Sequence, residues 1–174
     1  DWGSTADTLD MTGGTLTTGG WFILGYGSVN NGTFTISDGT ANVGSHLYVG
    51  FNGTGTLDMT GGTININGSF LIASEPNSIG TVYLDGGTIS SSTFIMTNGG
   101  LMDITAGTLI ADGDVTTTIN GYIGNGWIIA YSGSGIVNVD YNVTNPLKTT
   151  VTATMPPGPP TKATNPNPPD GATN

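Results

Sequence analysis

Acidic side chains are the residues that could do chemistry in this chain, because twelve Asp and Glu stand against two Lys, one His and no Arg. The segment Thr8-Leu-Asp-Met-Thr-Gly-Gly-Thr-Leu16 returns as Thr56-Leu-Asp-Met-Thr-Gly-Gly-Thr-Ile64, so Asp10 and Asp58 recur in one sequence frame. Two carboxylates beside a glycosidic bond can hydrolyse a polysaccharide, one as acid and the other as base or nucleophile. Whether these acids can cooperate depends on the elements that position them.

The repeat predicts those elements. Looser copies of the frame begin at Thr33, Thr81, Leu101 and Ile136, about 24 residues apart except at the last, which an insertion near residues 111–125 lengthens. Each copy reads as a short strand, a Gly-rich turn, a second short strand, another turn and an apolar third strand. Such units bury their apolar faces only by stacking, which predicts an all-β, right-handed, three-sided parallel β-solenoid (β-helix) of about six rungs. A β-sandwich also has regular short strands, but it does not require the same residue types at a fixed offset.

Alternation along the first strand of each rung sends Leu9 and Met11 inward and Asp10 outward. The predicted inward columns are entirely apolar: Leu9, Phe34, Leu57, Val82, Met102 and Val137, then Met11, Ile36, Met59, Leu84, Ile104 and Val139. The predicted outward column is Asp10, Thr35, Asp58, Tyr83, Asp103 and Asn138.

Acids in this outward column lie two rungs apart, which is about 9.6 Å. That separation is close to the spacing of an inverting glycosidase pair. Alternate rungs are also where Asp avoids stacking on a like charge, and this simpler explanation is preferred. We therefore expect a protein that is not an enzyme, with no catalytic residue and no cofactor.

Calcium is another ligand that acids could hold. Asp112-Gly-Asp114 is a dense acidic spot, but the Gly-Gly-x-Gly-x-Asp nonapeptides of calcium-binding β-helices are missing, so we expect a solvated loop and no metal site. We expect His46 in an exposed turn. Glycosylation sequons begin at four asparagines, although Asn-Gly-Thr also suits a turn that enters a strand; these candidates are Asn31, Asn52, Asn67 and Asn142.

The third strand of each rung predicts an interaction surface. Its inward positions are aromatic or aliphatic, so the large apolar residues between them face outward as a self-assembly interface: Ile23, Tyr48, Leu71, Ile95 and Ile128. A strand buried on one side does not ordinarily carry such a column, and exposed apolar patches mark contact sites. We expect the insertion, the segment 148–154 or a neighbouring subunit to cover it.

The module from Gly55 to Ile64, followed by an apolar strand and Gly, resembles the β-strand repeats of large secreted or surface-attached bacterial proteins. These are the autotransporter-associated type and the related PEP-CTERM and planctomycete extracellular repeats. The resemblance covers roughly residues 5 to 140, and it implies a solenoid with a structural or adhesive role. The run from Asn165 to Thr173 is similar to linkers that lead into Ig-like modules.

Domain organisation and function follow from these patterns. Residues 1–155 are predicted to form the solenoid, and residues 156–174 an extended Pro-rich tail or linker. No helical pattern caps either end, and bare strand edges template further strands. We expect a structural extracellular protein that self-assembles into a fibre, filament or surface matrix through its ends, its apolar third face and its tail, with head-to-tail stacking giving an open filament. The alternative is a carbohydrate-binding or adhesive stalk module excised from a larger bacterial surface protein, with exposed Tyr and Trp as platforms.

Composition narrows the partners. A net charge of −10 with two lysines argues against nucleic acid and against anionic membranes. No apolar run approaches the roughly 20 residues of a spanning helix, so we expect no membrane insertion. The expected partner is another copy of the chain, with glycans as the other class. The start at Asp1 suggests a processed product, and the Thr- and Asn-rich, Lys-poor composition favours an extracellular or cell-surface location.

Overall fold

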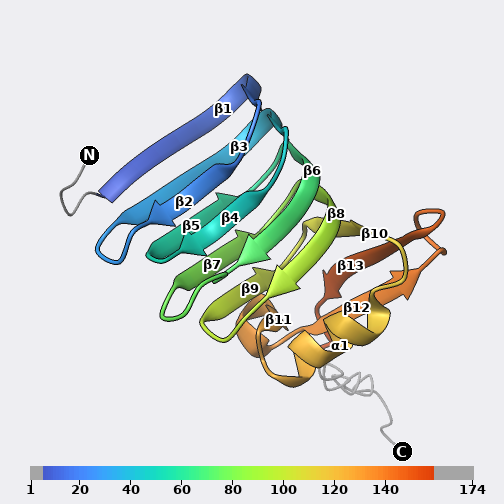
Figure 1. The fold of residues 1–174 in the computed structure, drawn as a ribbon. Coiled ribbons are helices and arrows are strands. Elements are labelled where there is room, and N and C mark those ends of the chain that lie inside the picture. The colour runs from blue at the N-terminus through green and yellow to red at the C-terminus, as the bar shows by residue number, and fades with distance from the viewer. Residues whose placement is uncertain (1–5, 159–174) are drawn as a thin grey trace, which may run out of the picture.

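The computed structural model describes residues 6–158, and strands dominate them (Figure 1). The strands are β1 (Ala6–Thr18), β2 (Phe22–Tyr26), β3 (Asn31–Val43), β4 (Leu47–Phe51), β5 (Thr54–Met59), β6 (Thr63–Ile72), β7 (Ile79–Leu84), β8 (Thr88–Met96), β9 (Gly100–Ile104), β10 (Thr108–Asp112), β11 (Ile128–Ala130), β12 (Ile136–Tyr141) and β13 (Lys148–Thr154). A helix, α1 (Thr116–Gly124), and a 3-10 turn, η1 (Tyr131–Gly133), interrupt them near the C-terminal end.

The strands stack into three parallel columns. The first column contains β1, β3, β5, β7, β9 and β11. The second contains β1, β3, β6, β8 and β10, and the third contains β2, β4, β6 and β8. Long strands such as β3 and β6 pass from one column to the next. The predicted all-β, three-sided parallel solenoid is therefore confirmed.

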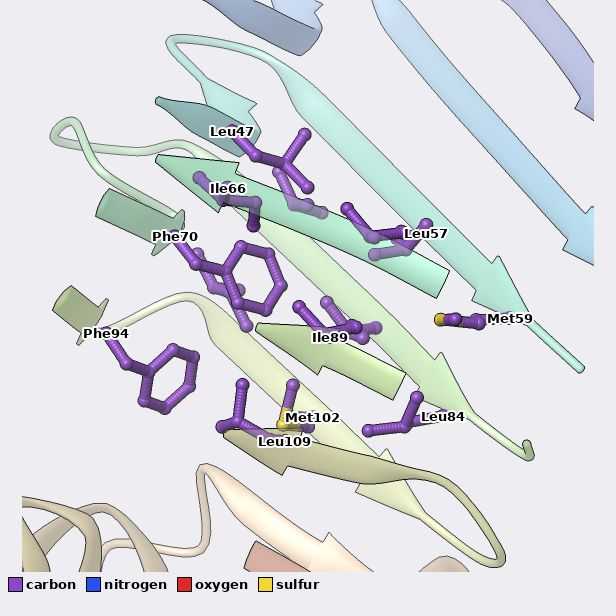
Figure 2. Close-up of a cluster of buried hydrophobic side chains, with 14 of the residues drawn as sticks. Leu47, Leu57, Met59, Ile66, Phe70, Leu84, Ile89, Phe94, Met102 and Leu109 are labelled. Carbon is purple, nitrogen blue, oxygen red and sulfur yellow. The ribbon is translucent and has the colours of Figure 1, made fainter. Parts of the chain in front are cut away.

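The core fills the space between the three columns (Figure 2). The pairing register places Phe34 on Leu57 and Leu57 on Val82, as predicted from the repeat. Leu57 and Val82 have no exposed surface. Burying one such aliphatic side chain contributes roughly 1.5–3 kcal/mol, so the continuous stack is the main source of stability.

Glycine is required at the corner where the third strand ends. Gly25 and Gly50 have φ values of 73° and 84°. A Cβ atom on Gly25 would lie 2.2 Å from the carbonyl oxygen of Thr54, and one on Gly50 would lie 2.3 Å from that of Ile79. The repeated Gly after the apolar third strand thus lets the chain turn close against the first strand of the rung after next, which is β5 for Gly25 and β7 for Gly50.

The sixth strand of the first column differs from the prediction. Ile128 pairs with Met102, and Ala130 pairs with Ile104, so β11 holds the place that Val137 and Val139 were expected to fill. The segment from Ile136 instead forms β12, which is antiparallel to β13. Asn138 is accordingly absent from the outward column of the first face. Both segments alternate apolar residues, and alternation alone does not distinguish the two placements.

The C-terminal end of the solenoid is covered, which corrects the expectation that neither end carries a cap (Figure 1). Residues 111–125 were predicted as an insertion, and α1 forms within them. Ile119 of this helix is completely buried, and Tyr122 packs edge-on against Phe94. A low helix propensity in Thr116–Gly124 is offset by this packing, because tertiary contacts supply most helix stability.

The segment 148–154 folds back, but onto the second column and away from the third. As β13 it pairs antiparallel with β10 on one side and with β12 on the other. The predicted Pro-rich tail falls almost entirely at residues 159–174, outside the described residues. In the described part, no helix has the length and apolar character needed to cross a membrane.

Candidate functional site

The N-terminal end of the described solenoid is open. Among the described strands, β1 pairs only with β3, and β2 pairs only with β4, so each has one edge without a neighbouring strand. Leu9 is 41% exposed, whereas Leu57, two rungs along the same inward column, is fully buried. We call this surface the open end and define it by the partly exposed Leu9, Leu16 and Phe22, beneath which Met11 and Leu24 are buried.

A hollow of about 350 Å³ lies at the open end between β1 and β2. Leu9, Phe22 and Leu24 line it from the apolar side. Asn30 also lines it, and the side-chain oxygen of Asn30 is buried with no hydrogen-bond donor in the described structure. A further strand laid across this end would add both an apolar side chain for the hollow and backbone N–H groups.

The opposite end of the same inward column is closed. Ile128 of β11 is 1% exposed, in contrast to Leu9 at the open end. Tyr122 stacks on Trp127 with ring centroids 5.7 Å apart, beside the helix. The two ends of the solenoid therefore present different surfaces, and at the N-terminal end Leu9, Leu16 and Phe22 are partly exposed.

Four of the five predicted interface residues form one column on the third face. The register pairs Ile23 with Tyr48, Tyr48 with Leu71, and Leu71 with Ile95. Ile23, Leu71 and Ile95 are half-buried, and Tyr48 is 9% exposed. Ile128 does not belong to this column, because β11 lies in the first column and Ile128 points into the core.

Aromatic residues flank this column on its first two rungs, where the sequence predicted exposed Tyr and Trp platforms only as a class, without naming positions. Trp21 directly precedes β2 and Tyr26 is its last residue, and His46 and Phe51 hold the same places at β4. Ring centroids are 5.5 Å apart for Trp21 and Tyr48, 5.1 Å for Tyr48 and Phe51, and 5.6 Å for Phe51 and Tyr26. The sequence feature that could have identified this group is an aromatic or His residue directly before the third strand and another aromatic residue directly after its glycine, in both rungs.

We call this group the aromatic platform and define it by Trp21, Ile23, Tyr26, His46, Tyr48 and Phe51. It is a grid of three outward positions on each of two neighbouring rungs. On the next rung the flanking positions become Ser69 and Ser74, so the rings end there. His46 also supports the backbone, because its Nδ1 accepts a hydrogen bond of 2.9 Å from the N–H of Ser69.

The predicted outward column of acids is correct for five of its six members. Asp10 pairs with Thr35, Thr35 with Asp58, Asp58 with Tyr83, and Tyr83 with Asp103. Asp103 is 6% exposed, and it accepts hydrogen bonds from the N–H and the hydroxyl of Ser132. Its carboxylate therefore holds η1 in place against the end of the first face.

Asp112 and Asp114, the other close pair of acids, also bind neighbouring side chains and backbone. Asp112 forms an ion pair of 2.8 Å with Lys148, which ties β10 to β13. Asp114 accepts hydrogen bonds from the N–H and the hydroxyl of Thr116, the first residue of α1. Within residues 6–158, no three His, Asp or Glu side chains gather closely enough to hold a metal ion.

All four sequon asparagines lie at exposed positions. Asn142 differs from the rest, because its side-chain oxygen accepts a hydrogen bond from the N–H of Leu147, and Thr144 of the same sequon donates to Asp140. Hydrogen bonds from the backbone and hydroxyl of Thr144 hold the pKa of Asp140 below its ordinary value. Asn31 at the start of β3, Asn52 between β4 and β5, and Asn67 within β6 stay candidate glycosylation sites.

The fold defines the class of this protein as a three-sided parallel β-solenoid. Comparison with known proteins adds no relative: no family model, no curated protein and no solved structure matches the chain.

Proposed function

We propose that this protein is a structural extracellular module that self-associates through its open end. The observation that carries this proposal is the exposure of core residues there, with Leu9 at 41% against 1% for Ile128 at the other end. The open end continues the inward columns of the solenoid, so the surface that fits it best is another rung with the same apolar pattern. A second copy of the chain supplies such a rung at its own open end.

The capped C-terminal end changes the expected mode of assembly. Head-to-tail stacking would need β11 and the hairpin of β12 and β13 to receive the open end of another copy, but α1 and η1 occupy that end. Two open ends can instead meet about a two-fold axis, with their edge strands antiparallel. Such a contact is isologous and closes at two copies.

The third face supplies the second contact of the proposal. Leu71 and Ile95 lie in the half-buried apolar column, beyond the aromatic platform. Side-by-side contact of this column joins end-to-end pairs into a fibre or surface matrix. The Thr- and Asn-rich rungs carry few charges, so copies stack without long ladders of like charge.

Sedimentation velocity over a range of protein concentrations tests this proposal. We expect the wild-type chain to form a two-copy species through the open end at the lower concentrations of this range, and Leu9→Lys to lose that species because a charge would be buried in the end-to-end contact. Leu147→Lys is the matched control, since Leu147 is a 70% exposed leucine in the turn between β12 and β13. A wild-type protein that stays single at high concentration, or equal association of both variants, contradicts the proposal.

A further inference from the structure

We propose that the aromatic platform binds a neutral polysaccharide. The inference rests on the platform alone and not on association at the open end. Trp21 is 56% exposed and directly precedes the five-residue strand β2, and Tyr26, the last residue of β2, is 63% exposed. Large aromatic rings at the surface present an apolar face together with a polar edge, which matches the apolar C–H face and hydroxyl rim of a pyranose.

The geometry suits an extended saccharide chain. Trp21 and Tyr26 are five residues apart, which is at most about 18 Å along the strand. Between them lies Ile23, which pairs with Tyr48 of the next rung, so an apolar side chain lies between the two rings. An oligosaccharide laid along β2 would contact a ring at each end and the side chain of Ile23 in the middle.

The rings are held in place before any ligand arrives. Tyr26 stacks on Phe51 with an angle of 3° between their planes, and Trp21 packs edge-on against Tyr48. Phe51 in turn contacts Tyr48, so the exposed rings are supported by the rings of the rung beneath. Rings that are already ordered lose little side-chain entropy on binding, which favours affinity.

The charge of the surroundings selects a neutral ligand. Lys148, the cation placed by the described residues, is on the second column and paired with Asp112. Asp7 lines the hollow next to Tyr26, and Glu75 follows Ser74 on the rung beyond the platform. With a net charge of −10 for the chain, an acidic polysaccharide would be repelled.

Affinity electrophoresis in native gels tests this inference. The gels contain hydroxyethylcellulose, xyloglucan or β-glucan as neutral probes, and polygalacturonate as the acidic one. We expect retardation in at least one neutral gel and none in polygalacturonate. Trp21→Ala and Tyr26→Ala should each weaken the retardation at least about tenfold, as loss of an aromatic anchor does. Tyr83→Ala is the matched control, because Tyr83 is a 41% exposed tyrosine on the first face.

Three results would overturn the inference: no retardation in any neutral gel, equal retardation of wild type and both ring variants, or retardation in polygalacturonate as strong as in the neutral gels. If instead Trp21→Ala abolishes the two-copy species without changing any gel, the platform contacts a second copy. Repeating the gels with Leu9→Lys separates this test from the one on self-association, since the inference predicts retardation of that variant too.

Discussion

Two leucines in nearly identical sequence surroundings give the sharpest test of the packing. Leu9 and Leu57 both lie in Thr-Leu-Asp-Met-Thr-Gly-Gly-Thr and in the same inward column, but Leu57 is fully buried and Leu9 is 41% exposed. Leu57→Ala should cost about 3–4 kcal/mol of unfolding free energy, because a cavity remains among its neighbours. Leu9→Ala removes three carbons, whose full burial contributes about 2.4 kcal/mol. Because Leu9 is only about six-tenths buried and its removal leaves no closed cavity, this variant should lose about 1.4 kcal/mol of unfolding free energy.

Equilibrium urea unfolding followed by circular dichroism measures this difference. At low protein concentration, where single copies dominate, the two variants should differ by about 2 kcal/mol. The gap should narrow as concentration rises, since association buries Leu9 as well. Equal losses at low concentration, or a loss below about 1 kcal/mol for Leu57→Ala, would refute the assigned register of the core.

Three further predictions concern salt, glycine and pH. Raising NaCl from about 0.01 M to 1 M shortens the Debye length from about 30 Å to about 3 Å. Copies that each carry a net charge of −10 should therefore repel each other less and associate more tightly in sedimentation runs. Weaker association at high salt would contradict an apolar contact. Gly80→Ala would place a Cβ 2.1 Å from the carbonyl oxygen of Val49 and should lower the free energy of unfolding by more than about 2 kcal/mol. Gly121→Ala lies within α1, where its Cβ would meet no neighbour, and should raise the free energy of unfolding by as much as about 1 kcal/mol. Thermal melts that rank the two variants otherwise would be inconsistent with these placements. Because the pKa of Asp140 is lowered in the folded state, its stabilisation is present above the ordinary Asp pKa of about 3.9 and is lost as pH falls below that value. The protection factor of the Thr144 amide, which is its exchange rate compared with that of an unstructured chain at the same pH, should therefore fall in acid, and Asp140→Asn should remove that pH dependence.

The repeat was sufficient to predict the solenoid and most of its register. Phe34, Leu57 and Val82 fall in one column because a fixed offset of residue types leaves a single way to stack them. The last rung could not be predicted in the same way. Ile128 and Val137 stand in similar alternating segments, and the choice between them depends on α1, whose sequence has weak helix propensity and forms through its contact with the core.

The surfaces were predicted less completely than the core. The column of Ile23, Tyr48, Leu71 and Ile95 followed from alternation, because inward and outward positions are linked along a strand. Trp21 and Tyr26 lie beyond the two ends of that alternation, and the turn at Gly25 sets the direction of Tyr26. Only the structure places their rings beside Tyr48 and Phe51.

Distance measurement between spin labels reports directly on self-association through the open end. The chain has no Cys, so a single cysteine introduced at an exposed position carries one label per copy. Thr8→Cys places it at the open end, and Val143→Cys places it in the 81% exposed turn beside the capped end. We expect a defined dipolar coupling between copies for the label at position 8 and none for the label at position 143. Absence of coupling at position 8, or equal coupling at both positions, would contradict self-association through the open end.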